Sequence, residues 1–417
     1  MKTAVRSIAA MALGLGTAQA QDAEQGPVEP VQFEGEFETL QPMMDAPGEA
    51  ETPEGQGYYV PSTVDTVLWG FLPNAESEPV LTVPSGALIT FDTVSHEGIL
   101  EDQGRDPVEY FAQFGVPEEH VIEDAIAIAA SDMAHDFADG PHIVTGPIAI
   151  EGAEPGDVLK VETLSITPRT GYGVISNRHG KGALPGEFPE TEPPAEDASA
   201  ENPEAYHNVS IFSPSTERDG TLYGLLHNTR QELVEYPLRP FMGLMGVAAN
   251  TTDPVPSVPP AEYGGNIDIN MLGAGSTVYY PVNVEGAMFY TGDPHAAQGD
   301  GEVALTALEH SMRPTFRVTL LKADSNDIPV TGGLTNPIGE TEEYWIPVGL
   351  DEDLDEAMKE AVRQAIGLLT AQYDMDRATA LAYLSAATDF EVSQVVDRTK
   401  GIHGLIRKSD FADIQSD

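Results

Sequence analysis

The sequence predicts a mainly β protein of the α+β class, in which a sandwich or barrel-like sheet system is followed by a C-terminal helical segment. Two observations lead to this prediction. From Tyr58 onward, short runs of β-branched and other apolar residues alternate with Pro and Gly, which is typical of strands joined by turns. After about residue 346 the apolar residues change to helical spacing. The length of 417 residues suffices for the core of one large domain or of two ordinary ones.

The strand-like runs lie within residues 58–345, which we expect to form one β-rich region. They cover residues 79–83, 87–91, 145–150, 276–284, 302–308 and 315–321. The connections between them are rich in Gly and Pro, which favours a sandwich or a closed sheet system. Residues 185–202 are dense in Glu and Pro and are expected to form a surface loop.

Residues 346–417 are expected to form a helical segment packed on the same domain. The acidic start at Asp351–Asp353 favours the dipole of a helix that follows it. One apolar stripe at helical spacing contains Leu354, Met358, Ala361, Ala365 and Leu368. Asp376 is placed to begin a second helix, and residues 392–396 are expected to return as a strand.

The first 20 residues have the pattern of a secretory signal peptide. Lys2 and Arg6 precede an apolar run over residues 8–15, and Ala18-Gln19-Ala20 supplies a small-x-small cleavage site. The alternative is a membrane anchor, but the run is shorter than the roughly 20 residues of a spanning helix. We therefore expect a periplasmic or secreted protein.

Residues 21–57 are rich in Glu, Pro, Gly and Gln and are expected to form a flexible acidic leader. The whole chain has 20 Lys and Arg against 68 Asp and Glu, a formal net charge of -48. Nucleic acids and anionic membranes require basic surfaces, so both are unsuitable partners. Such an acidic excess indicates a protein of a saline habitat, because salt screens its self-repulsion; the alternative is that it reflects only the acidic leader.

The chain contains no cysteine. This absence excludes a thiol nucleophile, a Cys-based zinc site and disulfide stabilisation. Other catalytic patterns also fail, since the segment after His96-Glu97 lacks the second histidine of a zincin and no G-x-S-x-G elbow occurs. The acidic run that begins at Asp324 lacks the glycine and the closing glutamate of a calcium loop.

The segment Gly292–Glu302 is the strongest candidate for a site. It places two aspartates, a histidine, a glutamine and a glutamate among glycines. Glycines allow close approach of the backbone to a ligand, and carboxylates with an imidazole suit a divalent metal. The alternative is an acidic surface turn, because Asp, Gly and Pro are common turn residues.

Four segments in order and spacing resemble the acetamidase/formamidase family. They are Pro141–Ile148 with Glu151–Asp157, Pro240–Val247, Gly264–Ile269 and Gly292–Glu302. The C-terminal region around Asp353–Met358 is also similar to that family, and the resemblance runs from about Tyr58 to Phe411. It departs at Tyr263, where the family commonly has histidine, and in the signal peptide, which is atypical of enzymes that usually work in the cytoplasm.

The resemblance implies a mainly β catalytic region, a homo-oligomer, and hydrolysis of a linear C–N amide bond to a carboxylate and ammonia. The substrate would be formamide, acetamide or a related amide. A chain without cysteine or a serine elbow still has to activate water, which a divalent metal, zinc or calcium, and a carboxylate base can do. A small-molecule amide is thus the expected partner.

The expected metal ligands are His142, Asp268, Asp293, His295 and Asp300. Glu302 is the expected general base, and Gln298 or Asn266 is expected to hold the substrate carbonyl. Alternatives remain open for two ligands: His142 can be a core histidine bonded to the backbone, and Asp268 can point to solvent from an alternating strand. His96, His135, His207, His227 and His310 show no grouping in the sequence and are not included.

The alternative function is a secreted, non-catalytic protein that binds calcium or another solute on the same fold. Loss of catalysis would fit both Tyr263 and the export signal. The two functions differ in the cation site, since a binding protein saturates its cation with protein ligands whereas a hydrolase keeps one position open.

Overall fold

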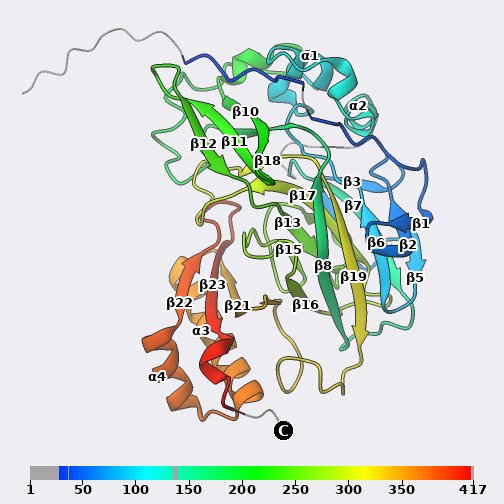
Figure 1. Cartoon of the computed structure of the whole chain (residues 1–417), viewed down its shortest axis with the longest axis vertical. Coiled ribbons are helices and arrows are strands. Elements are labelled where there is room, and N and C mark those ends of the chain that lie inside the picture. Colours follow the sequence, from blue (N-terminus) through cyan, green and yellow to red (C-terminus); the bar gives the residue numbers. More distant parts are fainter. Residues whose placement is uncertain (1–27, 36, 134, 136–139, 415–417) are drawn as a thin grey trace, which may run out of the picture.

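The computed structural model describes residues 28–35, 37–133, 135 and 140–414. Most of its regular structure is β-strand, with helices gathered near residues 107–129 and in the C-terminal region, so the predicted fold class is confirmed (Figure 1). The predicted signal peptide, residues 1–20, lies outside the described residues. Among the described helices, none has both the length and the apolar character needed to cross a membrane.

The first large sheet runs from the N-terminal hairpin to the C-terminal hairpin. In the described chain its strand order is β1-β2-β6-β19-β8-β16-β20-β21-β23-β22. All neighbours are antiparallel except β2 and β6, which are parallel. In that order the strands are Gly48–Thr52, Gly55–Val60, Ala87–Phe91, Met312–Leu321, Val158–Pro168, Thr277–Pro281, Ile338–Glu340, Tyr344–Asp351, Lys400–Arg407 and Asp389–Val392.

The second large sheet has the main order β12-β11-β10-β9-β18-β17-β13-β15. These strands are Leu233–Pro237, Thr221–His227, Val209–Arg218, Tyr172–Asn177, Leu308–Glu309, Phe289–Ala297, Phe241–Gly246 and Gly264–Asn266. A branch from β17 adds β7 (Ile143–Ile150), which in turn pairs with β3 (Val67–Trp69) and β5 (Leu81–Val83). A small separate sheet joins β4 (Phe71–Leu72) to β14 (Val255–Pro256).

The main core lies between the two large sheets. Phe91 of β6 and Phe316 of β19 come from the first sheet, and Phe289 of β17 comes from the second. Their ring centroids are 5.5 to 6.0 Å apart in edge-on geometry, which is favourable for aromatic rings. All three side chains are wholly buried. This contact fixes β17, the strand that carries much of the candidate site, against the first sheet.

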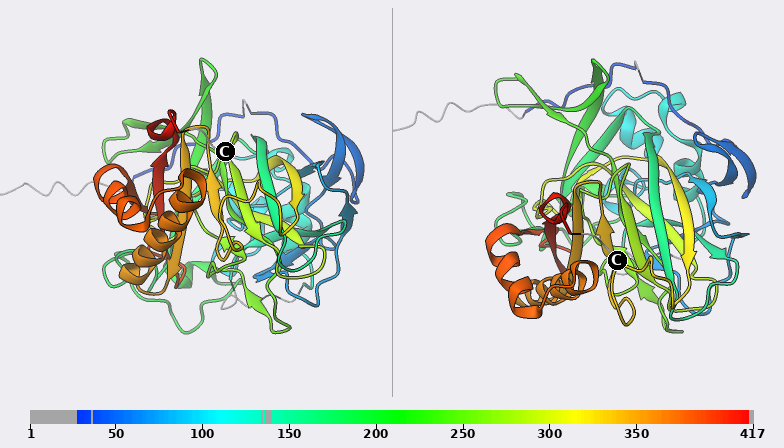
Figure 2. Two further views of the ribbon diagram at one scale, coloured as in Figure 1. Left: turned by 90° about the horizontal axis from the view of Figure 1, so that it is seen from below. Right: turned by 60° about the horizontal axis from the view of Figure 1, so that its bottom comes forward.

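The helices lie at two ends of the molecule (Figures 1 and 2). They are α1 (Pro107–Ala112), α2 (Glu123–Ala129), α3 (Leu354–Tyr373) and α4 (Arg377–Ala387), with 3-10 turns at Glu101–Gln103, Glu118–His120, Pro203–Tyr206 and Lys408–Phe411. The Asp353 and Asp376 side chains accept hydrogen bonds from the first turns of α3 and α4, so both predicted helix starts are confirmed.

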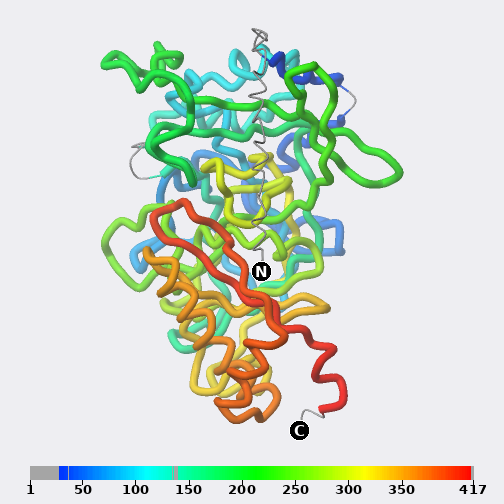
Figure 3. Tube along the Cα trace, turned by 90° about the vertical axis from the view of Figure 1, so that its left-hand side faces the viewer, coloured from blue at the N-terminus to red at the C-terminus, as the bar shows by residue number. Residues whose placement is uncertain are grey.

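Helix α3 packs closely on β21 because the residues between them are small. Ala357 and Ala361 are wholly buried, and a Cβ added at Gly349 of β21 would lie 2.3 Å from the Ala361 nitrogen. The C-terminal segment is less helical than expected, since β21 and β23 extend the first sheet and the predicted strand at 392–396 lies instead at Asp389–Val392. Strands β22 and β23 pair as the C-terminal hairpin, which is drawn in orange-red to red in the tube view (Figure 3).

The prediction of a flexible leader over residues 21–57 is wrong for its described part. Residues 48–52 form β1, and Phe33 packs edge-on against Tyr172 with ring centroids 5.7 Å apart. The Leu40 carbonyl accepts a hydrogen bond from the Arg169 guanidinium at 3.0 Å. Composition alone missed these contacts because the few apolar residues of the leader pack onto a core that the rest of the chain builds.

Two local predictions around the candidate site are also wrong. Residues 302–308 do not form a strand, because Glu302 and Leu305 have φ of 45° and 124°, which interrupt an extended path. Conversely, the segment Gly292–Glu302, with its glycines, was expected to be a ligand-binding loop, but Asp293 and His295 lie within β17. Residues two apart on a strand face the same side, so β17 presents both side chains together.

A buried ionic network joins the leader, α2 and the first sheet. Arg169 is wholly buried and donates to both carboxylate oxygens of Asp124, at 2.6 and 3.1 Å. It also lies 3.2 Å from Asp92, whose carboxylate accepts a hydrogen bond from Tyr59 at 2.5 Å and pairs with Arg313. A buried arginine with two carboxylate partners cannot be removed without leaving charge uncompensated.

We expect Arg169→Leu to lower the free energy of unfolding by about 3–5 kcal/mol, because it leaves two buried carboxylates without this partner. Urea unfolding measures the change. Arg317→Leu is the matched control, since its side chain is 43% exposed and lies 3.9 Å from Glu162; its effect should stay within about 0.5 kcal/mol. Equal effects of the two changes would contradict a structural role for the network.

Candidate active site

Eight titratable side chains, seven of them buried and Asp397 half-buried, form a group here called the carboxylate–histidine cluster. Its members are His96, His142, Asp268, Asp293, His295, Glu302, Glu309 and Asp397. They come from segments that are distant in the sequence. His96 follows β6, His142 precedes β7, Asp268 follows β15, Asp293 and His295 lie in β17, Glu302 lies in the next loop, Glu309 lies in β18, and Asp397 lies between β22 and β23. Within the described chain, four overlapping triads of this cluster have ligand atoms within 4.8 Å of one another.

Strand β17 supplies the centre of the cluster. The His295 Nε2 atom lies 3.0 Å from the Asp293 carboxylate and 3.2 Å from Glu309, its partner across the β17–β18 pair. The His96 Nδ1 and His142 Nε2 atoms lie 3.5 and 3.7 Å from Asp293. Asp293 is therefore faced by imidazoles from three different segments.

Other side chains fix two of these imidazoles. His295 Nδ1 lies 3.0 Å from the Gln298 Oε1 atom, and His142 Nδ1 lies 2.8 Å from the Ser257 hydroxyl. When His295 carries its proton on Nδ1 and donates a hydrogen bond to Gln298, the lone pair on its Nε2 points into the cluster. This is the usual arrangement of a metal-binding histidine, whose second nitrogen is held by a neighbouring group.

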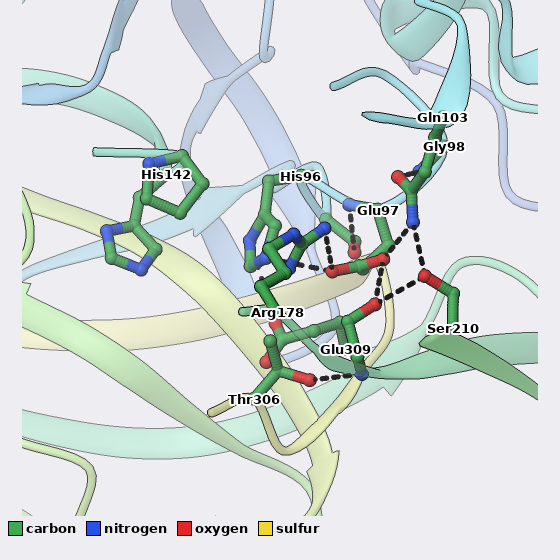
Figure 4. A network of polar contacts seen from close by, with 12 residues as sticks. His96, Glu97, Gly98, Gln103, His142, Arg178, Ser210, Thr306 and Glu309 are labelled. Carbon is green, nitrogen blue, oxygen red and sulfur yellow. Dashed lines mark hydrogen bonds and ion pairs between the residues drawn. The ribbon is translucent and has the colours of Figure 1, made fainter. Parts of the chain in front are cut away.

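In the described part of the chain, His96 is fixed by burial among acidic side chains and not by hydrogen bonds. Neither of its ring nitrogens has a hydrogen-bond partner among the described residues, although Glu97 lies 3.3 Å from Nε2. Arg178 donates at 3.0 Å to Glu97 Oε1, the oxygen that also faces His96, and at 2.7 Å to Asp102 (Figure 4). The Ser176 hydroxyl donates to the other Glu97 oxygen, Oε2, at 2.7 Å, so both oxygens of Glu97 are held. The wall of the site around His96 is thus an ion-paired unit.

Burial and mutual repulsion shift the pKa values of the acids. Burial, followed by the charges of Asp268 and Asp397, raises the pKa of Glu302 well above its usual range. Burial also raises the pKa of Asp268 and of Asp397. Asp293 is the opposite case: burial opposes its ionisation, but His142 and His295 hold its pKa well below the usual range.

The histidines are shifted in both directions. Burial lowers the pKa of His142 to about 4. Burial has the same tendency at His96, but Asp293 and Glu97 outweigh it and raise the pKa of His96 to about 10. Strong and opposite shifts within one group of contacts are typical of functional sites.

The cluster opens onto a cavity of about 530 Å³. Its walls include His96, His142, Asn266, Asp293, Glu302, Glu309 and Asp397 from the site, together with Arg178, Lys181 and Arg398 and the apolar residues Leu100, Val258, Leu305, Val395 and Val396. Asp268 and His295 are wholly buried and lie behind this wall. Small-molecule sites have this combination of an apolar lining and a few convergent polar groups.

The backbone at the site adopts unusual conformations. Asp268, Asp293, Glu302 and Asp397 have φ of 48°, 49°, 45° and 61°, in the left-handed region that L-residues rarely occupy. Such conformations persist only where the surroundings enforce them, and they gather at functional sites. The tertiary structure therefore determines the direction in which the side chains of these four acids point.

The structure brings together most of the residues that the sequence predicted. His142, Asp268, Asp293, His295 and Glu302 all lie in the cluster, so His142 is not merely a core histidine and Asp268 does not point to solvent. Asn266 is buried, lines the cavity, and has an Oδ1 atom without a hydrogen-bond partner in the described chain.

Two predicted residues occupy other positions. Asp300 is exposed and lies with Glu391 and His403, apart from the cluster. Gln298 uses its amide nitrogen to donate to the Asp268 and Ser393 carbonyls at 2.9 and 3.1 Å. Its amide oxygen faces His295, so Gln298 positions that histidine, and the expectation that it holds a substrate carbonyl does not fit these contacts.

Sequence reasoning missed His96, Glu309 and Asp397. His96-Glu97-Gly98 follows a correctly predicted strand, and two ligand-type residues before a glycine at a strand end are a usable signal. Glu309 and Asp397 stand among ordinary apolar and charged neighbours without any such signal. Tyr263, the departure noted above, is buried in the main core and is not among the residues that line the cavity.

Comparisons with known proteins identify the family of this chain. The sequence model of the Acetamidase/Formamidase family matches residues 119–254 and 248–405, which together cover more than half of the chain. The chain belongs to the acetamidase/formamidase family. The matched stretches include every cluster residue except His96.

Individual members of the family are similar in sequence to about half of this chain. An acetamidase of Mycolicibacterium smegmatis is 32% identical over 253 residues, which are 51% of this chain and 61% of that protein. A formamidase of Methylophilus methylotrophus is 31% identical over 245 residues, 51% of this chain and 59% of that protein. The similarity thus spans about three fifths of these relatives.

Solved structures of acetamidase/formamidase proteins share the fold. A predicted acetamidase/formamidase from Thermoanaerobacter tengcongensis superposes with a TM-score of 0.63 at 24% identity, covering 85% of this chain and 97% of that one. An acetamidase from Bacillus halodurans gives the same TM-score and identity over 85% and 99%.

The cluster depends on Gly243 of β13, which leaves room for it. A Cβ at this position would lie 2.6 Å from both the Asp268 Oδ1 and the His295 Cε1 atoms. We therefore expect Gly243→Ala to displace the cluster and to lower affinity for added Zn²⁺ about 10–100-fold, as changes to residues that support ligands do. Equilibrium dialysis measures the affinity.

Gly186→Ala is the matched control, because nothing lies within 4 Å of the added methyl group. The control should bind Zn²⁺ like the wild type. Unchanged affinity in Gly243→Ala would show that the cluster does not depend on this gap.

Proposed function

We propose that the protein hydrolyses a linear amide to a carboxylate and ammonia. The observation that carries the proposal is the buried carboxylate–histidine cluster, which opens through Glu302, Asp293 and His96 onto a ligand-sized cavity. Membership of the acetamidase/formamidase family and relatives named acetamidase and formamidase support the same reaction. The comparisons give no support to the alternative of a non-catalytic calcium- or solute-binding protein.

The cluster has the donors that a divalent cation needs. Several of its buried atoms lack a hydrogen-bond partner in the described chain, namely both ring nitrogens of His96, both carboxylate oxygens of Asp268, Asp293 Oδ1, His295 Nε2, Glu302 Oε2 and Glu309 Oε2. Buried polar groups rarely remain unpaired. We propose that His96, His142, Asp293 and His295 hold the cation and that Asp268 supports them.

The donor set favours zinc over calcium. Calcium takes six to eight oxygen ligands, whereas zinc is bound by imidazole nitrogens together with carboxylates. Three imidazoles face Asp293 here. When bound, such an ion polarises a carbonyl and lowers the pKa of water.

The chain's own residues then have separate tasks. Glu302 lines the cavity next to Asp268 and Asp397, and its raised pKa suits a group that takes a proton from water and returns it to the leaving nitrogen. The Asn266 side chain, which lines the cavity and has an Oδ1 atom without a partner in the described chain, would hold the amide group of the substrate. The apolar part of the lining keeps water away from the reacting bond.

The cavity volume favours a substrate larger than acetamide. Pockets of roughly 300–1,000 Å³ accommodate drug-sized ligands, and the cavity measures about 530 Å³. Leu100, Val258 and Leu305 offer an apolar surface, with Lys181 and Arg398 also in the lining. We propose an amide with an extended substituent.

Export and assembly are further proposals. Residues 1–20 are the basis for a periplasmic or secreted enzyme, and the net charge of -48 is the basis for a saline habitat. A homo-oligomer is proposed on the family resemblance alone.

Changing Glu302→Gln should reduce kcat for amide hydrolysis at least about 100-fold, because general-base catalysis contributes roughly 10²–10⁴. Zinc content and urea unfolding should stay close to those of the wild type. Glu285→Gln, at an exposed position, is the control for the same chemical change. His295→Ala should instead lower zinc content, and full retention of zinc would remove it from the ligands.

A panel of amides tests both the reaction and the size of the substrate. Formamide, acetamide, hexanamide and phenylacetamide are incubated with chelated and with zinc-restored protein, and ammonia is measured. We expect ammonia only after zinc is restored, with a higher kcat/KM for the two larger amides. No ammonia from any amide would contradict the proposed reaction, and a preference for formamide would contradict the proposed size.

A further inference from the structure

The loop that follows β17 is attached to the C-terminal hairpin β22–β23 by two backbone hydrogen bonds at the edge of the cavity, whose wall includes Val395. The Gly301 N–H donates to the Ser393 carbonyl and the Val395 N–H donates to the Gly301 carbonyl, both at 3.0 Å. Gly301 lies next to Glu302, and Gln298 of the same loop positions His295. The junction therefore connects the hairpin β22–β23 to two residues of the candidate active site.

Three side chains that commonly bind metals converge at this junction. Asp300 projects from the loop, and Glu391 and His403 are directly opposite each other on β22 and β23. One ligand atom from each lies within 4.8 Å of the others. Cross-strand partners present their side chains on the same face, which explains why Glu391 and His403 meet.

The histidine of this group has an unused nitrogen. His403 is wholly buried, and its Nδ1 atom is paired with the Ser393 hydroxyl at 2.8 Å. Its Nε2 atom has no hydrogen-bond partner among the described residues and lies 3.7 Å from the Glu391 carboxylate. A buried ring nitrogen without a hydrogen-bond partner is uncommon, and an ion bound between the imidazole and the two carboxylates would supply the missing partner.

We propose that Asp300, Glu391 and His403 form a second divalent-cation site, distinct from the carboxylate–histidine cluster. None of the three is among the residues that line the cavity. One imidazole and two carboxylates suit Zn²⁺ or Mn²⁺, and water can complete the coordination because Asp300 is exposed. The proposal does not depend on amide hydrolysis.

The site can close on an ion with small movements. Ligand atoms around a tetrahedral zinc lie roughly 3.3 Å apart, given metal–ligand distances of about 2.0–2.1 Å. His403 is fixed by burial and by Ser393, whereas Glu391 is half-buried. Asp300 is exposed and accepts one hydrogen bond, from the Asn270 amide to Oδ1 at 2.8 Å, which leaves its second oxygen available. The two carboxylates can therefore rotate toward the fixed imidazole.

A bound ion would join the hairpin to the loop that carries Gln298 and Glu302. It would add metal–ligand bonds to the two backbone hydrogen bonds already present. It would also neutralise part of the repulsion between Asp300 and Glu391 in a chain with a net charge of -48. The expected consequence is a more stable junction, measurable without any substrate.

The test uses the full chain, freed of metal by a chelator and then equilibrated with Zn²⁺ by dialysis. We expect Asp300→Asn and Glu391→Gln each to bind about one zinc ion fewer per chain than the wild type. The reason is that removing one of three ligands removes most of the affinity of the site for the ion. Asp389→Asn is the control, since it removes an exposed charge from the same strand but does not belong to the group.

The His295→Ala background separates the two sites, because it weakens the cluster and leaves the junction intact. In that background Zn²⁺ should still raise the melting temperature, and adding Asp300→Asn should abolish the rise. Since Asp300 is exposed, this change should not prevent folding. Equal zinc stoichiometry in the wild type and in Glu391→Gln, or an undiminished melting shift with Asp300→Asn, would overturn the proposal.

Discussion

The structure depends on holding a group of carboxylates and imidazoles together and out of water. Burying such groups without compensation is strongly unfavourable, so the surrounding elements have to fix each one. Strand β17 does most of this, because it lies between β13, β18 and β7 in the second sheet and carries Asp293 and His295 on one face. Its Phe289 packs against the first sheet, which ties the site to the main core.

The local backbone shows how strongly the site is constrained. Asp268, Asp293, Glu302 and Asp397 all have left-handed φ angles, each of which is unfavourable by of order 1–3 kcal/mol for an L-residue. Gly243 leaves the space that Asp268 and His295 occupy. The cluster is therefore a preorganised feature that the rest of the fold stabilises, which is what metal binding and proton transfer both require.

The C-terminal region contributes to the site in two ways. Asp397, in the connection between β22 and β23, is itself a member of the cluster. The hairpin also holds the loop around Gly301 through backbone hydrogen bonds. Part of the segment that was predicted to be helical and packed on the same domain thus forms part of the wall of the cavity, and helix α3 packs against β21 and β23.

Local patterns in the sequence determined the fold class, the helix starts at Asp353 and Asp376, and several of the strands. They also marked Asp293, His295 and Glu302, because ligand-type residues near glycines are a local signal, whereas His142 and Asp268 were singled out in segments that resemble the family. The tertiary structure alone decided that His96, Glu309 and Asp397 join them and that Asp300 does not. The reason is physical: strand pairing between segments far apart in the chain, and backbone conformations enforced by that packing, determine which side chains meet.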